Sequence, residues 1–197
     1  MKKKLFIISN ESIYYKNNKF FCDNIDLKST PEGLSKKFEI NLFGRKSFKK
    51  RTHQIKIKNI KIFKNIFSYI YSVIISHKKN EAKYLIISIT PYTFLVSVCL
   101  RLIGVKPMVY LRSDGFGEYK AILGKIGPFI YQIMFSITAM ISNLASCREY
   151  ILGSKKGKIL SPSQLDSTWF KKIKPTEIKK FKLLYVGRIR VEKGIFS

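Results

Sequence analysis

Short apolar runs alternate with longer stretches of helical period along most of the chain, and this alternation restricts the possible fold more than any other feature. Strand-like runs lie at residues 5–9, 38–43, 54–62, 84–89 and 107–111, with short late runs at 144–147 and 158–160. Helical periodicity covers residues 64–78, 92–103 and 118–143. This order is typical of a parallel sheet wrapped by helices, so we expect an open α/β domain.

The connection between the first two strands has two parts. Residues 10–28 are polar and aromatic by turns, which indicates an irregular excursion that could include a hairpin. Residues 29–34 predict a short helix, because Ser29 or Thr30 can cap it and Pro31 suits the first helical position. Further along, Phe67 and Tyr71 are expected to widen the buried stripe of the helix at 64–78.

In open α/β sheets, ligands bind beyond the carboxyl ends of the strands, where the helices begin. This rule directs attention to the corners after Ser9, Thr90, Leu111 and Val186. The corner after Leu111 carries Arg112, Ser113 and Asp114. Any site built from backbone loops at these corners would lie at one edge of the sheet.

The charge balance is strongly basic. Lysine and arginine number 38 against 12 acidic residues, which gives a net charge of +26, and the basic residues are spread along the chain. Such a chain favours phosphate-bearing partners: nucleic acid, anionic lipid or phosphorylated small molecules. Cys22, Cys99 and Cys147 are far apart, odd in number and form no CxxC pair, which argues against a disulfide framework and for a reducing compartment. No metal site is expected.

The last strand-like run, residues 181–186, ends in the most informative segment. Gly187 leaves room for close approach by a ligand, and Arg188 can grip phosphate oxygens in pairs. Lys193 adds a point charge as a helix is expected to begin, and helix N-termini favour anions. The three residues predict a diphosphate site, and the alternative is a solvated turn in a lysine-rich chain.

Val186-Gly187-Arg188 and Glu192-Lys193-Gly194 resemble the signature that opens the C-terminal domain of GT-B glycosyltransferases, especially family 4. The resemblance implies two Rossmann-like domains, with Arg188 and Lys193 on the diphosphate of a nucleotide-sugar donor. Residues 1–178 would be the acceptor-side domain with its linker at 161–177, and 179–197 the opening of the donor domain. It also implies retention of anomeric configuration, no cofactor and no required metal. Because the family's later acidic motif would lie beyond Ser197, we expect this chain alone to have little or no transferase activity.

Two further places resemble the acceptor cleft of this family. Gly33 falls where the family often has a glycine-rich turn, although only one glycine is present here and a long insert precedes it. Arg112, Ser113 and Asp114 fall near a position where members commonly have a histidine, which this chain lacks. Asp114 could position an acceptor hydroxyl or simply cap a helix, and Arg112 could hold a phosphate or pair with Asp114. No catalytic residue is assigned beyond Asp114 as a candidate.

The expected function is sugar transfer from a nucleotide sugar to a glycan or lipid-linked acceptor in cell-surface polysaccharide synthesis. The expected location is the cytoplasm, with peripheral association with the inner, anionic face of the cell membrane. One alternative is a basic nucleic-acid-binding protein, which is disfavoured because Phe63, Phe67, Phe94 and Phe135 fall in apolar runs and look like core residues. The other is a membrane protein, because residues 126–147 contain no charge and are long enough to cross a bilayer.

Overall fold

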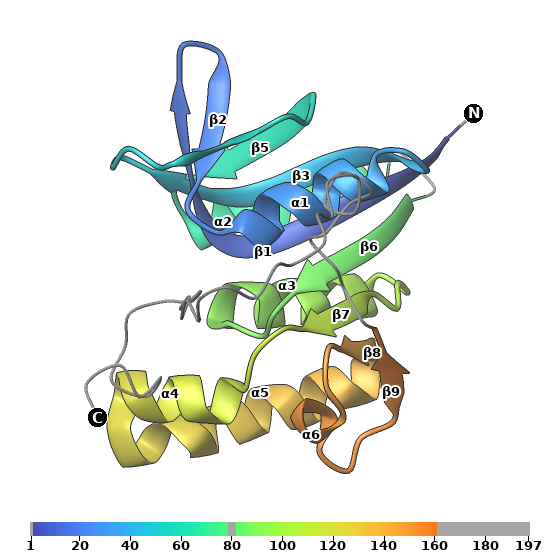
Figure 1. Ribbon diagram of the computed structural model, residues 1–197. Coiled ribbons are helices and arrows are strands. Elements are labelled where there is room, and N and C mark those ends of the chain that lie inside the picture. Colours follow the sequence, from blue (N-terminus) through green and yellow to red (C-terminus); the bar gives the residue numbers. More distant parts are fainter. Residues whose placement is uncertain (1, 79–81, 161–197) are drawn as a thin grey trace, which may run out of the picture. The chain divides into compact units, whose positions relative to one another are not determined.

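Parallel strands form the centre of the computed structural model, which describes residues 2–78 and 82–160. The parallel strands follow the spatial order β5, β3, β1, β6, β7, β8, β9 (Figure 1). Their bounds are β1 (Lys3–Lys16), β3 (Phe38–Ser47), β5 (Asn59–Phe63), β6 (Ala82–Ile87), β7 (Met108–Leu111), β8 (Asn143–Ser146) and β9 (Gly157–Ile159). The expected α/β class is confirmed, and the open, mostly parallel sheet is compatible with a Rossmann-like fold.

An antiparallel branch extends from the middle of this sheet. β1 continues past its pairing with β6, turns at Asn17 and Asn18, and pairs with β2 (Lys19–Cys22), which in turn pairs with β4 (His53–Ile55). Both asparagines have positive φ, 49° and 55°, as a tight hairpin turn of this kind requires. The excursion at residues 10–28 therefore includes a hairpin that lengthens the first strand (Figure 1).

Helices cover both faces of the sheet because side chains alternate along each strand. Phe6 and Ile8 of β1 face a core shared with α2 (Ile66–Lys78), α3 (Pro91–Leu102) and α5 (Gly127–Ile141). Leu5 and Ile7 face the opposite core, where Leu27 of α1 (Ile25–Leu34) is fully buried. α6 (Glu149–Leu152) follows β8 and contributes Ile151 to the first core.

The structure corrects several expected boundaries. α1 begins at Ile25, not near Pro31, because the side chain of Asn24 accepts a hydrogen bond from the Asp26 amide and caps the helix. The single strand expected over 54–62 is two separate strands, β4 and β5. Phe67 and Tyr71 are 82% and 66% exposed rather than buried, because α2 turns a different stripe, which includes Tyr69, toward the core.

The apolar segment at 115–141 is a hairpin of two helices. α4 (Gly115–Leu123) leads through a short 3-10 turn, η1 (Gly124–Ile126), into α5, so the single helical stretch expected over 118–143 is interrupted before Gly127. A Cβ atom on Gly127 would lie 2.0 Å from the carbonyl oxygen of Tyr119, so only glycine permits this close approach. The helices run antiparallel, since Phe116 contacts Phe135 and Tyr119 contacts Tyr131.

The expected linker at 161–177, the strand at 181–186 and the domain boundary between 178 and 179 lie outside the described residues. The described residues all belong to one compact unit, Met1–Pro162.

Candidate functional site at the carboxyl edge of the sheet

The strand order places a topological switch point between β1 and β6. From β1 the chain proceeds outward to β3 and β5, then returns through α2 to β6 on the other side of β1 and continues to β9. Connections leaving adjacent strands in opposite directions open a crevice at their carboxyl ends. A register shift within β1 and the loops after β6 and β7 lie at this edge, which is the candidate site.

A bulge in β1 shapes the first wall of this edge. The pairing of β1 with β3 shifts register between Ile8 and Ser12, and bulges of this kind commonly lie beside functional sites. Ser9 within the bulge is fixed by Tyr69 of α2. The Ser9 amide donates to Tyr69 Oη over 3.1 Å, and that hydroxyl donates to the carbonyl oxygens of Ser9 and Phe43 at 2.9 and 3.2 Å. Complete burial raises the pKa of Tyr69, so the hydroxyl keeps its proton.

The end of β6 forms the second wall and contains a constrained backbone. Ser88 has φ 63°, a region that residues other than glycine rarely adopt. Its amide donates to the Tyr110 carbonyl oxygen over 2.9 Å, and its carbonyl accepts from Thr93 Oγ1 over 2.9 Å. Two residues later, Thr90 caps α3 in a reciprocal capping box with Thr93. Strained backbone held from both sides is a feature of functional corners.

Arg112 at the end of β7 reaches the N-terminus of α1. Its Nη2 atom forms an ion pair with Asp26 and lies 3.1 Å from Asn24 Oδ1. The Asn24 amide group donates in turn to Glu11 Oε1 of β1 over 2.6 Å. Because β7 and β1 lie on opposite sides of β6, this chain of contacts connects the two sides of the switch point.

The corner after Arg112 is compact. Asp114 caps α4 by accepting a hydrogen bond from the Phe116 amide over 3.0 Å, which confirms the capping interpretation of that aspartate. Ser88, Arg112 and Ser113 line a hollow that holds about one water molecule. Gly115 closes it, because a Cβ there would lie 2.1 Å from the ring of Tyr131.

The structure brings together some of the predicted residues and separates others. Arg112, Ser113 and Asp114 share the carboxyl edge, but Arg112 pairs with Asp26 and not with Asp114 as the sequence suggested. Gly33 lies in the last turn of α1, exposed and away from the capped N-terminus that reaches Arg112. Gly187, Arg188 and Lys193 lie outside the described residues.

Sequence reasoning missed the polar partners that build the edge. Glu11, Asn24 and Asp26 belong to the segment for which the sequence predicts an irregular excursion, and no local pattern marks Ser88. A cap signal is present in the sequence, because an asparagine followed two residues later by an aspartate in the first helical turn is a common helix start.

The chemistry of the edge suits a hydroxyl-rich ligand. Three helices begin here, and the carboxylates of Glu11, Asp26 and Asp114 can accept hydrogen bonds. Arg45 of β3 lies beside the bulge of β1, where its Nη1 atom donates to Asn10 Oδ1 over 3.4 Å. Its guanidinium carbon lies 5.3 Å from the centre of the Tyr92 ring. Within residues 2–78 and 82–160, no three His, Cys, Asp or Glu side chains form a group that could hold a metal ion.

Comparison with protein families, with curated proteins and with solved structures finds no match to this chain. Function is therefore inferred from the geometry of this edge together with the sequence.

Proposed function

We propose that this chain supplies the acceptor-side domain of a GT-B glycosyltransferase that takes a nucleotide-sugar donor. The observation that carries the proposal is the switch point between β1 and β6, with strained and capped corners around it. The segment containing Gly187, Arg188 and Lys193 adds the donor side by sequence resemblance alone. In this scheme Arg188, Lys193 and the N-terminus of the helix that the sequence predicts near Lys193 stabilise the charge of the leaving diphosphate.

The acceptor would bind at the carboxyl edge. Glu11 and Asp114 offer carboxylate oxygens to sugar hydroxyls, and the Arg112 to Asp26 ion pair fixes the spacing between the two walls. Asp114 is the candidate for positioning the attacking hydroxyl, and its exposure leaves it accessible. The acceptor class that fits is a glycan or a lipid-linked sugar, and the proposed pathway is surface polysaccharide assembly.

The donor side is tested by nucleoside diphosphate binding to the full chain. Calorimetric titration of uridine and guanosine diphosphates is expected to show binding that weakens at least about tenfold in the double variant Arg188→Gln/Lys193→Gln. Lys155→Gln/Lys156→Gln removes the same charge from an exposed turn and should retain wild-type affinity within about twofold. Absence of binding by both nucleotides, or equal weakening in the two double variants, would contradict the proposal.

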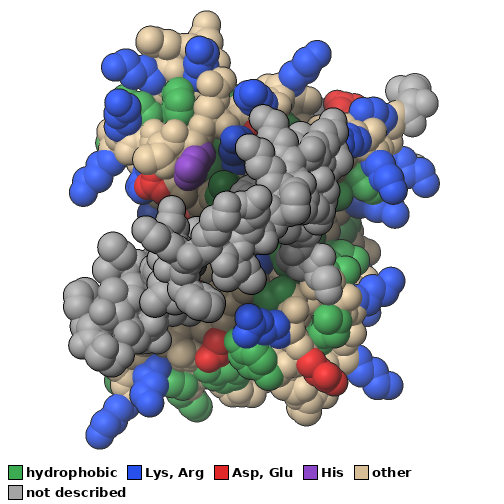
Figure 2. Space-filling view, viewed as in Figure 1, with side chains coloured by type: hydrophobic (Ala, Val, Ile, Leu, Met, Phe, Trp, Pro, Cys, Tyr) green, Lys and Arg blue, Asp and Glu red, His purple; other side chains and the backbone are tan. Residues whose placement is uncertain are grey.

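A second element of the proposal is peripheral binding to an anionic membrane through the tip of the α4–α5 hairpin, which we define as residues 120–130. Ile122, Ile126 and Phe129 are 75%, 66% and 67% exposed there, beside Lys120 and Lys125. An apolar surface with adjacent lysines is the combination that holds a protein at an anionic interface. On the face shown in Figure 2, Lys and Arg side chains stand out along the described part of the surface, with few acids between them.

The folding of this segment favours surface binding over a span. Residues 115–141 are long and apolar enough to cross a membrane, and 28% of the most apolar window is buried. They are folded, however, as two antiparallel helices that share the aromatic contacts of Phe116 and Tyr131. A hairpin of this kind presents its tip to the interface.

Flotation with vesicles tests this element. The chain should float with phosphatidylcholine vesicles that contain phosphatidylglycerol. With vesicles of phosphatidylcholine alone, it should remain in the bottom fraction of the gradient. Ile126→Gln/Phe129→Gln should abolish flotation, whereas Phe67→Gln/Tyr71→Gln, which removes equally exposed aromatic rings from α2, should not. Equal flotation on neutral vesicles would indicate insertion across the bilayer and contradict peripheral binding.

A further inference from the structure

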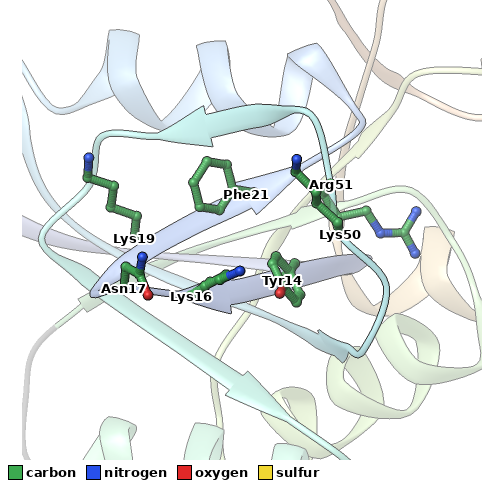
Figure 3. Close-up of a pocket in the computed structure, with 7 residues that line it drawn as sticks. All are labelled: Tyr14, Lys16, Asn17, Lys19, Phe21, Lys50 and Arg51. Atoms are coloured by element: carbon green, nitrogen blue, oxygen red, sulfur yellow. The ribbon is translucent and has the colours of Figure 1, made fainter.

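The β1–β2 hairpin carries a basic and aromatic face that the sugar-transfer proposal does not use. In its register Tyr14 lies opposite Phe21, and Lys16 lies opposite Lys19. Because side chains two residues apart on a strand share a face, these four side chains project from the same side of the hairpin. Figure 3 shows them around a common hollow.

The loop that follows β3 completes this hollow. Lys50 and Arg51 stand on its far side, and the hollow has a volume of about 230 Å³ (Figure 3). Arg51 is anchored, since its Nε atom donates to Ser47 Oγ over 3.1 Å and its Nη1 atom pairs with Asp23. The hydrogen bond from Arg51 lowers the pKa of Asp23, and the charged carboxylate pairs with the guanidinium at neutral pH.

The lining of the hollow carries several positive charges and no negative charge, so its lysines repel one another when no anion is bound. Of the seven residues that line it, none is acidic and four are cationic: Arg51, which is paired with Asp23 outside the hollow, and Lys16, Lys19 and Lys50. Like charges directly opposite each other destabilise an antiparallel pair, and Lys16 and Lys19 stand in this relation at the end of the hairpin. An anion between them would relieve the repulsion.

The floor of the hollow is aromatic. The ring centres of Tyr14 and Phe21 are 6.4 Å apart, with the planes tilted by 46°. Two rings in this arrangement offer an apolar platform for the flat face of a ring, while the lysines project around it (Figure 3). The hollow is smaller than most ligand pockets, and its volume admits a single ring that carries one phosphate.

We infer that this hollow binds a small phosphorylated ligand whose ring packs against Tyr14 and Phe21 and whose phosphate is held by Lys16 and Lys19. The ring can be that of a sugar or of a nucleobase, and the two share the same recognition chemistry. Binding here is independent of the diphosphate site proposed at Arg188 and Lys193. The site is distinct from the crevice at the β1–β6 switch point.

The test is titration of glucose 1-phosphate, uridine monophosphate and inorganic phosphate, followed by NMR shifts of the backbone amides of residues 14–21. Lys16→Gln/Lys19→Gln should weaken all three ligands at least about tenfold. Phe21→Leu should weaken the two ring-bearing ligands severalfold and leave inorganic phosphate unchanged, because only the ring touches the aromatic floor. Whichever ring-bearing ligand binds more tightly identifies the source of the ring.

Controls separate this site from bulk charge and from the diphosphate site. Lys155→Gln/Lys156→Gln and Arg188→Gln/Lys193→Gln should both leave glucose 1-phosphate binding and the hairpin shifts intact. The inference is overturned if Lys155→Gln/Lys156→Gln weakens binding as much as the hairpin variant does. It is also overturned if Phe21→Leu, shown by thermal melting to be folded, weakens inorganic phosphate equally. Shifts at the hairpin with single-stranded oligonucleotides but with none of the three small ligands would overturn it in favour of nucleic-acid binding.

Discussion

Replacing Tyr69 with phenylalanine tests whether one buried hydroxyl fixes the edge of the candidate site. That hydroxyl accepts from the Ser9 amide and donates to the carbonyl oxygens of Ser9 and Phe43, so it joins α2 to β1 and β3 at the bulge. Tyr69→Phe would leave a buried amide and two carbonyl groups short of a partner. A buried polar group left without a hydrogen bond costs about 1–3 kcal/mol of stability. The cost is smaller for a carbonyl oxygen, because its second lone pair can keep another partner. We therefore expect a loss of about 3 kcal/mol in the free energy of unfolding.

Urea denaturation followed by circular dichroism measures this loss, with Tyr71→Phe as the matched control. Tyr71 belongs to the same helix but is 66% exposed, so its variant should change the free energy of unfolding by less than about 0.5 kcal/mol. Equal destabilisation by the two variants would refute the reasoning, because the loss would then come from helix propensity and not from the three hydrogen bonds.

Three further predictions concern other buried or capping positions. Gly115→Ala should destabilise the protein by about 1–3 kcal/mol in thermal melts, because the added Cβ would collide with the Tyr131 ring. In the control Gly33→Ala the added Cβ meets open space, so this variant should be neutral or stabilised by up to about 1 kcal/mol. Burial raises the pKa of the Cys22 thiol from 9.0 to about 11, so its contribution to stability is complete below pH 9 and is lost as the pH rises toward 11. Urea midpoints of Cys22→Ala should therefore fall less steeply over this range than those of the wild type, and an identical slope would count against the assignment. Asp114→Ala should lower the free energy of unfolding by about 1 kcal/mol, because α4 loses its N-terminal cap. An unchanged free energy of unfolding would show that the cap does not stabilise the fold.

The fold class could be predicted from the sequence because each strand and helix has its own local period. The boundaries failed where a local signal competed with tertiary contacts. Pro31 suits a first helical position, yet Ser35 donates to its carbonyl and the helix simply passes through it. Phe67 and Tyr71 have the right spacing for a core stripe, but which side of α2 is buried depends on where β5 and α3 lie, and periodicity alone does not contain that information.

The candidate site could be predicted only as a set of corners. The rule that ligands meet the carboxyl ends of strands points to the corners at Ser9 and Arg112, and the structure places both residues at that edge. The pairing of Arg112 with Asp26 joins residues 86 positions apart, and it exists only because β7 and α1 meet across β6. Strand order determines this contact, and strand order was not readable from local patterns.

The carboxyl edge and the hollow of the β1–β2 hairpin differ in how the charge of their basic side chains is compensated, and this difference predicts what each can bind. Arg112 in the crevice is paired with Asp26, so a ligand there would gain mainly from hydrogen bonds to neutral and acidic groups. Lys16 and Lys19 on the hairpin oppose each other, so a ligand there would gain mainly from its own negative charge. Salt screens exposed charges, hence binding at the hairpin should weaken as ionic strength rises, while binding in the crevice should change little. A hydroxyl-bearing acceptor and a phosphorylated ligand can thus occupy the same domain without competing for one site.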